Sequence, residues 1–329
     1  MPWDSVPWAV RNGTTSPELG RLLAHVAFNG NAGIVGAADL KVSQLATPGA
    51  AVLVAPGACA IPCRAAGQAY QAYAGRMATQ DQADVTAVGA GGSRSDMVVA
   101  RVEDPTLSGE PWQTPIDIPN GPYIFTRVLA NVGAAAVASH KAATDYLAAQ
   151  GMSAIPLAGI TRAASATTVL QANLVDLRRI ANARRDRQMF TVNPGAVANL
   201  TSATYGNWFG SWQVEIPVWA VRAVVAVNIG GVRLDRTSTS ASGTANGAVR
   251  VQLGTLLTQA AAYDFETTPS NAVGRYTVAA GDTLAIPAGD RGQVRTLTIQ
   301  GNKAGGNKNV YADTATFATV DIEFQEAAA

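Results

Sequence analysis

The stretch Ile155–Arg187, IPLAGITRAASATTVLQANLVDLRRIANARRDR, decides how this chain is divided, because its pattern differs from that on either side. Leu170, Leu174, Leu177 and Ala181 follow one another at intervals of four, three and four residues. This spacing puts them on one stripe of a helix, as in a helix that packs against copies of itself or a neighbour. We therefore predict a helical connector over residues 166–187, with these four residues as oligomerisation contacts.

The polar side of the predicted helix carries five arginines and two aspartates, a pattern typical of ion pairs between chains. Two heptads are too few for a stable coiled coil alone. A single amphipathic helix that lies on its own domain is therefore an equal alternative.

Composition limits the classes of partner. The chain has 329 residues, enough for two domains, a net charge of +1 and only 14% charged residues, which argues against nucleic acid and anionic membranes. No run approaches the roughly 18 apolar residues of a membrane-spanning helix. The start, MPWDSVPW, lacks the order of a secretory signal. We expect the protein to stay where it is made or to leave as part of an assembly.

Residues 1–165 combine an arm, a helix and strands. Residues 1–15 contain two prolines and two tryptophans and predict an extended arm. Ser16 can cap a helix whose apolar face is Leu19, Leu22, Leu23, Val26 and Ala27, and Asn29-Gly30 ends it. Short alternating runs then predict strands around the Pro48-Gly49 turn and at 97–102, 123–128 and 155–160. Residues 16–165 are therefore predicted as a β domain with a leading helix.

Residues 188–329 predict a second β domain. Strands are expected at 188–193, 212–219, 221–229, 247–253, 274–278, 283–286, 293–300 and 315–324, separated by Gly-rich turns. About eight short strands are typical of a β-sandwich with a jelly-roll-like arrangement. The predicted fold class is therefore mainly β, with two β-sandwich-like domains, a short helical connector and one N-terminal helix.

Motifs of enzymes and of metal or cofactor sites are weak. The run GAGGSR, residues 89–94, precedes a strand and lacks the ending of a phosphate loop. Cys59 and Cys63 with His25 and His140 do not supply the four ligands of structural zinc, and we expect small, reduced, buried thiols. No Ser or Cys stands in a nucleophile-elbow context.

Carboxylates in strand-like contexts are the remaining catalytic candidates: Asp96, Glu103, Asp104, Glu215 and Asp321. Any two could converge as a glycosidase pair, but Asp96 and Arg101 bracket a buried strand as a structural pair does. We predict a protein that is not an enzyme and needs no cofactor or metal.

An aromatic cluster in the second domain has two interpretations. Tyr205, Trp208 and Trp212, with Phe209 and Trp219 nearby, are candidates for contact with a glycan or a subunit interface. They equally suit the core of a sandwich, because large aromatics dominate core burial.

Several uncommon segments occur together in the first part of the chain: MPWDSVPW, SPELGRLLAHVAFNG, GIVGAADLKV, SRSDMVVARVEDP, GEPWQTP, GPYIFTRVL and DLRRIANARRDR. Over about residues 1–190 they resemble minor tail proteins of tailed phages that infect actinobacteria. The resemblance implies a virion structural protein of the tail tip or baseplate that docks on other tail proteins. It is much weaker beyond residue 190 and carries over no catalytic residue.

The preferred hypothesis is thus a subunit of a phage tail in the virion, made in the host cytoplasm, homotrimeric by analogy with other phage tip proteins. Its second domain would face the host envelope. The alternative is a carbohydrate-binding module that recognises arabinogalactan-like or other cell-wall glycans.

Overall fold

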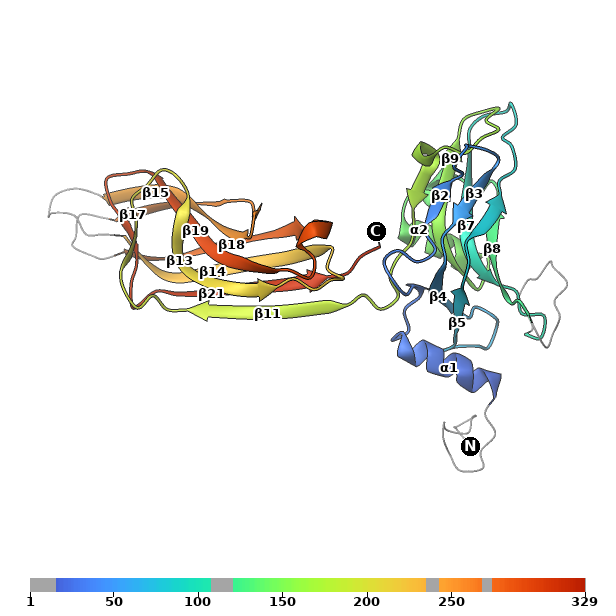
Figure 1. The fold of residues 1–329 in the computed structure, drawn as a ribbon, viewed down its shortest axis with the longest axis horizontal. Coiled ribbons are helices and arrows are strands. Elements are labelled where there is room, and N and C mark those ends of the chain that lie inside the picture. Colours follow the sequence, from blue (N-terminus) through green and yellow to red (C-terminus); the bar gives the residue numbers. More distant parts are fainter. Residues whose placement is uncertain (1–15, 108–120, 235–242, 268–273, 329) are drawn as a thin grey trace, which may run out of the picture. The chain divides into compact units, whose positions relative to one another are not determined.

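The computed structural model describes residues 16–107, 121–234, 243–267 and 274–328, so the predicted arm lies outside the described residues. The chain is mainly β, with several antiparallel sheets and an N-terminal helix, as predicted (Figure 1). It divides into two compact units, one ending at Ala183 and the other spanning Arg184–Ala327.

The first unit contains three sheets, with strand orders β1-β4-β5, β2-β3-β6 and β10-β9-β7-β8. Its elements are α1 (Pro17–Ala27), β1 (Gly33–Ile34), β2 (Val42–Gln44), β3 (Ala51–Val54), β4 (Gly57–Pro62), β5 (Ala72–Met77), β6 (Asp81–Asp84), β7 (Arg94–Val102), β8 (Ile124–Leu129), the 3-10 turn η1 (Ala134–Val137), α2 (His140–Ala149), β9 (Ala154–Arg162), the 3-10 turn η2 (Gln171–Asn173) and β10 (Leu174–Asp176).

Strand β7 is buried on both faces, and its alternate residues serve two cores. Met97 and Val99 pack with Leu147 of α2. Val98 and Val102 belong to the core that the smaller sheets share. Because successive side chains of a strand point to opposite faces, one strand joins the helix layer to the sheet layer.

Both helices begin at a serine cap. Ser16 Oγ accepts a hydrogen bond from the Leu19 amide at the start of α1, as the sequence predicts. Only Leu19 of the predicted apolar face is buried, and Val26 is exposed. Helix α2 was not predicted, although Ser139 caps it in the same way and Gly151, at φ +63°, follows its end.

The prediction of a helical connector over residues 166–187 is wrong. The segment forms η2, the short strand β10, irregular chain and, from Arg185, the start of the strand β11 (Arg185–Val192). Its backbone bonds to other strands: the Leu177 amide donates to Leu157 O at 3.1 Å and the Ala181 amide to Ile34 O at 2.8 Å. These long-range bonds and the β-branched residues Thr167–Val169 outweigh the apolar spacing.

The predicted stripe is also split between core and surface. Leu177 and Ala181 are buried within the first unit, Leu174 is half-buried, and Leu170 is exposed. The arginines of this stretch pair within the chain: Arg178 with Asp176, Arg184 with Glu326, Arg185 with Glu323 and Arg187 with Asp321.

We expect Leu177→Ala to destabilise the first unit by about 2–5 kcal/mol, because it leaves a cavity beside Met97 and Leu147. Urea denaturation followed by circular dichroism measures this loss. Leu170→Ala is the matched control and should leave the midpoint unchanged. A change in oligomeric mass with an unchanged midpoint for Leu177→Ala would favour the oligomerisation stripe instead.

The second unit contains two packed sheets. Its elements are β11 (Arg185–Val192), β12 (Ala198–Leu200), β13 (Gly206–Glu215), β14 (Arg222–Leu234), β15 (Gly243–Leu253), β16 (Leu256–Leu257), β17 (Ala261–Thr267), β18 (Gly274–Ala285), the 3-10 turn η3 (Ala288–Asp290), β19 (Val294–Gly305), β20 (Val310–Ala312) and β21 (Phe317–Gln325).

Its long strands pair as β11-β21-β14-β18 in one sheet and β13-β19-β15-β17 in the other. Leaving aside the short strands β12, β16 and β20 and numbering the rest in chain order, the orders are 1-8-3-6 and 2-7-4-5. This is the pairing order of a jelly roll. Strand β17 was not predicted, and the two strands expected at 274–278 and 283–286 are one strand, β18, because Gly281 pairs with Ala226 instead of turning.

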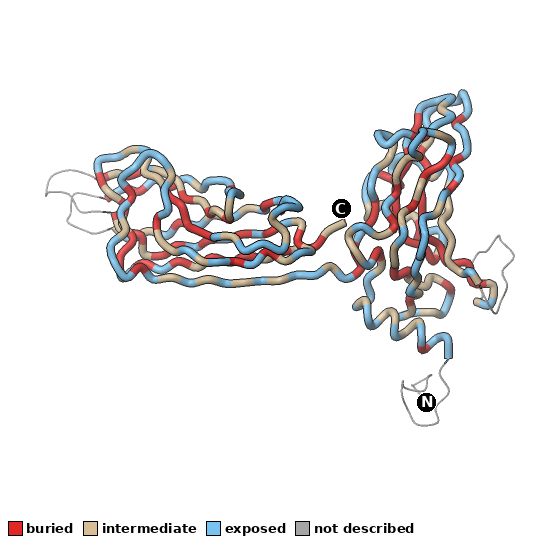
Figure 2. The backbone as a smooth tube through the Cα atoms, in the orientation of Figure 1, coloured by how far each residue is buried: buried red, intermediate tan, exposed pale blue. Residues whose placement is uncertain are grey.

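Inward-facing aliphatic side chains of both sheets form one core, which includes Val225 and Ile322 from the first sheet and Val251 and Ile299 from the second. Figure 2 shows the resulting alternation of buried and exposed residues along these strands. A bulge interrupts β14 between Ile229 and Val232. Gly231 sits there at φ +75°, where a Cβ atom would lie 2.3 Å from Ala315 O, so only glycine fits.

Candidate functional site

Carboxamide and hydroxyl side chains gather on the outward face of β13, β19 and β15, which we call the amide face: Asn207, Ser211, Gln213, Gln252, Thr296, Thr298 and Gln300. The strand register sets them in cross-strand rows. Asn207 lies beside Gln300, and Ser211 beside Thr298, which lies beside Gln252. Uncharged hydrogen-bonding groups therefore cover neighbouring positions of three strands.

A hydrogen-bond network fixes the centre of the amide face. Gln300 Nε2 donates to Gln252 Oε1 and, at 3.4 Å, to Asn207 Oδ1. Gln300 Oε1 accepts from Arg250 Nε at 2.8 Å. The Arg250 guanidinium in turn lies 3.9 Å from the centre of the Tyr205 ring, a cation–π contact that anchors Tyr205 beside the network.

The three aromatic candidates from the sequence are not in one place. Trp208 is buried in the jelly-roll core, where its Nε1–H donates to Ala198 O at 3.2 Å. Trp212 is half-buried against Phe190, with ring centres 5.5 Å apart. Only Tyr205 borders the amide face. The sequence signal for this face is the alternation of Thr296, Thr298 and Gln300 with Leu297 and Ile299 in the strand predicted at 293–300.

The outward face of β11-β21-β14-β18 has a different chemistry, and we call it the ion-pair face. Arg187 Nε contacts Asp321 Oδ1 at 2.9 Å, and Arg185 Nη1 lies 3.4 Å from Glu323 Oε1. Exposed apolar side chains lie on the same face: Met189 is opposite Asp321, Val224 is opposite Glu323, and Phe317 lies farther along β21, opposite Gly230. The remaining positions are mostly small residues, including Ala226, Ala279 and Gly281.

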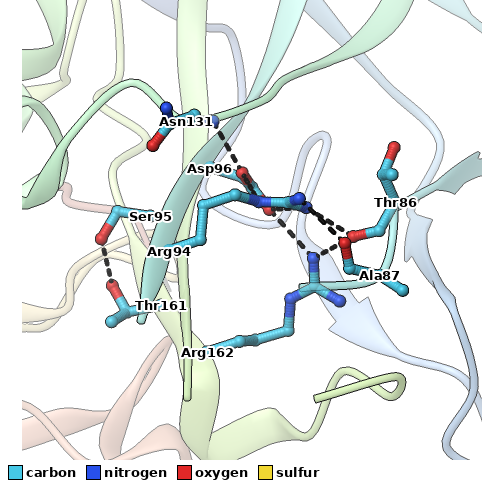
Figure 3. Close-up of polar contacts among 8 residues, drawn as sticks. All are labelled: Thr86, Ala87, Arg94, Ser95, Asp96, Asn131, Thr161 and Arg162. Carbon is cyan, nitrogen blue, oxygen red and sulfur yellow. Dashed lines mark hydrogen bonds and ion pairs between the residues drawn. The ribbon is translucent and has the colours of Figure 1, made fainter. Parts of the chain in front are cut away.

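A buried charge cluster ties the loop after β6 to strands β7 and β9 (Figure 3). The Asp96 carboxylate accepts bonds from Arg94 Nε at 2.8 Å, from Arg162 Nη2 at 3.0 Å and from the Asn131 amide at 2.9 Å. Both arginines also donate to the Thr86 carbonyl oxygen. The side chains of Asp96 and Arg162 are fully buried, so the cluster holds the loop in place.

The other carboxylate candidates bind different partners. Glu103 binds Arg127 Nε at 2.8 Å, Asp104 accepts from the Thr106 amide, and Asp321 binds Arg187. Glu215 is the last residue of β13, and Asp321 lies on β21, which belongs to the other sheet of the second unit. The expected pairing of Asp96 with Arg101 is wrong, because Arg101 lies on the opposite face of β7, 4.0 Å from Glu103.

Electrostatics also disfavours acid catalysis at two of these carboxylates. Burial acts to raise the pKa of Asp96, but the bonds from Arg94, Asn131 and Arg162 outweigh it, so the pKa lies below its usual value. The Arg187 hydrogen bond likewise lowers the pKa of Asp321. A general acid that works near neutral pH needs a raised pKa instead.

A pocket of about 520 Å³ lies in the first unit beside β5 and β8, with an apolar floor that includes Leu40, Met77 and Leu157 and a rim that includes Arg76 and Asp81. Cys59 also lines it, and burial raises the pKa of this thiol to about 12. The thiol is therefore protonated at neutral pH and unsuited to nucleophilic attack. Cys59 is buried, and Cys63 is half-buried.

Within the described ranges, no group of three or more His, Cys, Asp or Glu side chains could hold a metal ion. None of the helices in the part of the chain that the structure covers is long and apolar enough to cross a membrane.

Comparison with known proteins gives no family. No family model matches the chain, and no curated protein matches it. A crystal structure of the VP2 subviral particle of infectious bursal disease virus aligns with a TM-score of 0.26 and 12% identity, covering 91% of this chain and 74% of that chain. A structure of T=1 particles derived from the same virus aligns with a TM-score of 0.26 and 12% identity, covering 96% of this chain and 80% of that chain.

Proposed function

We propose that this protein is a structural subunit of a phage virion, placed at the tail tip or baseplate, that assembles through its β surfaces. The resemblance of about residues 1–190 to minor tail proteins supports the location. In this proposal the first unit docks on other tail proteins, and the jelly roll carries the contact with further copies of the chain. The observation that carries the proposal is the ion-pair face.

The ion-pair face has the composition of a subunit contact. Met189 is 60% exposed and Phe317 is 54% exposed, although burial of such side chains removes apolar surface from water. The small residues around them let a second surface approach closely. Arg185 and Arg187 alternate with Glu323 and Asp321 across the sheet, so the same face on another copy offers charges of both signs.

The size of the face is sufficient. Strands spaced about 4.8 Å apart, each about 27 Å long, give the four-stranded face an area of roughly 500 Å². Two such faces in contact would bury about 1,000 Å², which reaches the lower range of specific interfaces. We therefore place the oligomer contact here, and not on the predicted stripe, of which Leu177 and Ala181 are buried in the first unit.

We expect the full-length protein to be a homo-oligomer. Contact between two ion-pair faces alone gives a dimer, and the trimer predicted by analogy requires each face to divide its contact between two neighbours, so the mass should be two or three times the 33.8 kDa of the chain. The double variant Met189→Lys/Val224→Lys should lower this mass to that of the monomer, because it replaces apolar surface of the contact with charged groups that would have to lose their water on assembly. Light scattering coupled to size-exclusion chromatography measures both masses.

Val294→Lys is the matched control, since Val294 is about as exposed but lies at the start of β19. It should keep the parental mass. A parent protein that is monomeric, or a double variant with the parental mass, would contradict the contact. Labelling of intact virions with an antibody against this chain tests the location at the tail tip.

A further inference from the structure

We propose that the amide face binds a neutral polysaccharide, an activity that goes beyond the structural role. The inference rests on the side chains of β13, β19 and β15 and on Tyr205. The ion-pair face has no part in it.

The two outward faces of the jelly roll differ in chemistry. The ion-pair face presents guanidinium and carboxylate groups. In the central rows of the amide face Asn207 and Ser211 are exposed and Gln252 is half-buried, whereas Thr298 and Gln300 between them are buried. Arg250 is the one charged side chain in these rows. Amides and hydroxyls both donate and accept hydrogen bonds, which matches the mixed donor and acceptor character of sugar hydroxyls.

The network prepares this surface for a ligand. Gln300 is only 9% exposed, and its carboxamide forms hydrogen bonds with Gln252, Asn207 and Arg250. It therefore holds these neighbours in place. Asn207 is exposed, and its Oδ1 is turned toward Gln300, which leaves the two Nδ2 protons directed away from the network. Side chains that are fixed before binding lose less conformational entropy when a ligand arrives.

Tyr205 adds an apolar surface at the edge of these rows. Its ring contacts the Arg250 guanidinium, which itself bonds to Gln300, so the aromatic ring is linked to the amides. A sugar ring needs both kinds of contact, because its C–H groups pack on aromatic surface while its hydroxyls bond to polar groups. Neither Tyr205 nor Gln300 neutralises the Arg250 charge, but the other side chains of these rows are uncharged, so most of the contacts open to a ligand suit an uncharged sugar.

Affinity electrophoresis of the full-length protein tests the proposal, with soluble arabinogalactan or dextran as neutral probes and polygalacturonate as the anionic probe in the gel. We expect at least one neutral probe to retard the parent protein. Asn207→Ala should weaken this binding about tenfold, the effect of losing one or two hydrogen bonds. Tyr205→Ala should weaken it by a similar factor.

Asn199→Ala is the matched control, because Asn199 is also an exposed strand asparagine but lies on β12 in the other sheet. It should bind as the parent does. Gln300→Leu separates positioning from contact: it should weaken binding although Gln300 is nearly buried, with a circular dichroism spectrum like that of the parent.

Three results would overturn the proposal: no retardation by either neutral probe, retardation by polygalacturonate alone, or equal losses for Asn207→Ala and Asn199→Ala. The oligomeric mass should be unchanged in every amide-face variant. Failure of glycan binding therefore leaves the assembly proposal standing, and failure of assembly does not remove the binding.

Discussion

Asp96→Asn should destabilise the first unit by about 3–5 kcal/mol, because it removes the one carboxylate that neutralises two arginines in the buried cluster. The Arg162 side chain is fully buried and would keep its charge without a partner. The loop after β6 should also be held less firmly, since both arginines that bind the Thr86 carbonyl also bind Asp96. Hydrogen exchange measured by mass spectrometry should show faster exchange in β7 and β9.

Acid should weaken the stabilising effect of the same cluster. The pKa of Asp96 is lower in the folded chain than in the unfolded one, so its stabilising contribution is complete above the unfolded value of about 3.9 and is lost as the pH falls through the folded value. The stability of Asp96→Asn should therefore depend less on pH below about pH 4 than that of the parent.

Asp145→Asn is the control for this variant, because Asp145 is an exposed partner of Lys141 on α2. It should keep the parental midpoint and pH dependence. Similar midpoints for Asp96→Asn and the parent would show that the cluster contributes nothing to stability.

Trp208→Ala is the second change with a large expected effect, about 3–5 kcal/mol of unfolding free energy in the jelly roll. The indole fills the core beside Leu200 and Gly301, and its loss also leaves the Ala198 carbonyl without its hydrogen bond. Urea denaturation monitored by the circular dichroism of the chain measures the change. The tryptophan is thus expected to act through packing, not through contact with a glycan.

Trp208→Phe should recover part of the lost stability, because it restores most of the apolar volume but not the donor. Tyr205→Ala should leave the midpoint near that of the parent, since Tyr205 lies outside the core. A folded Trp208→Ala protein with parental stability and lost glycan binding would reverse this assignment.

Sequence patterns correctly predicted the helices and strands that depend on neighbouring residues. Ser16 and Asn29-Gly30 bound α1, and the apolar runs at 97–102 and 155–160 fall inside β7 and β9. The prediction of a helix at 166–187 failed because backbone groups of this segment bond to Leu157 and Ile34, which lie far away in sequence. Spacing alone cannot reveal a partner that distant in the chain.

The candidate site was predictable only in part. Tyr205 was named from composition, but Asn207, Gln252 and Gln300 meet only because β13, β19 and β15 are neighbours in the jelly-roll order. A sequence shows which face of one strand a residue occupies, but not which strands lie beside it. For the same reason, the burial of Trp208 required the packing of two sheets.

Strands β11 and β21, the first and last of the jelly roll, run antiparallel with Arg185 opposite Gln325. Arg184 and Glu326 close that end, with Arg184 Nε 2.9 Å from Glu326 Oε2. The chain therefore comes into the domain and leaves it at one point. A pulling force applied through these two residues would open the β11–β21 ladder one bond at a time, starting at this ion pair. Tension between Arg184 and the opposite end of the sheet would run along the strands, so many hydrogen bonds would have to break together, and the domain would resist far more strongly in that direction.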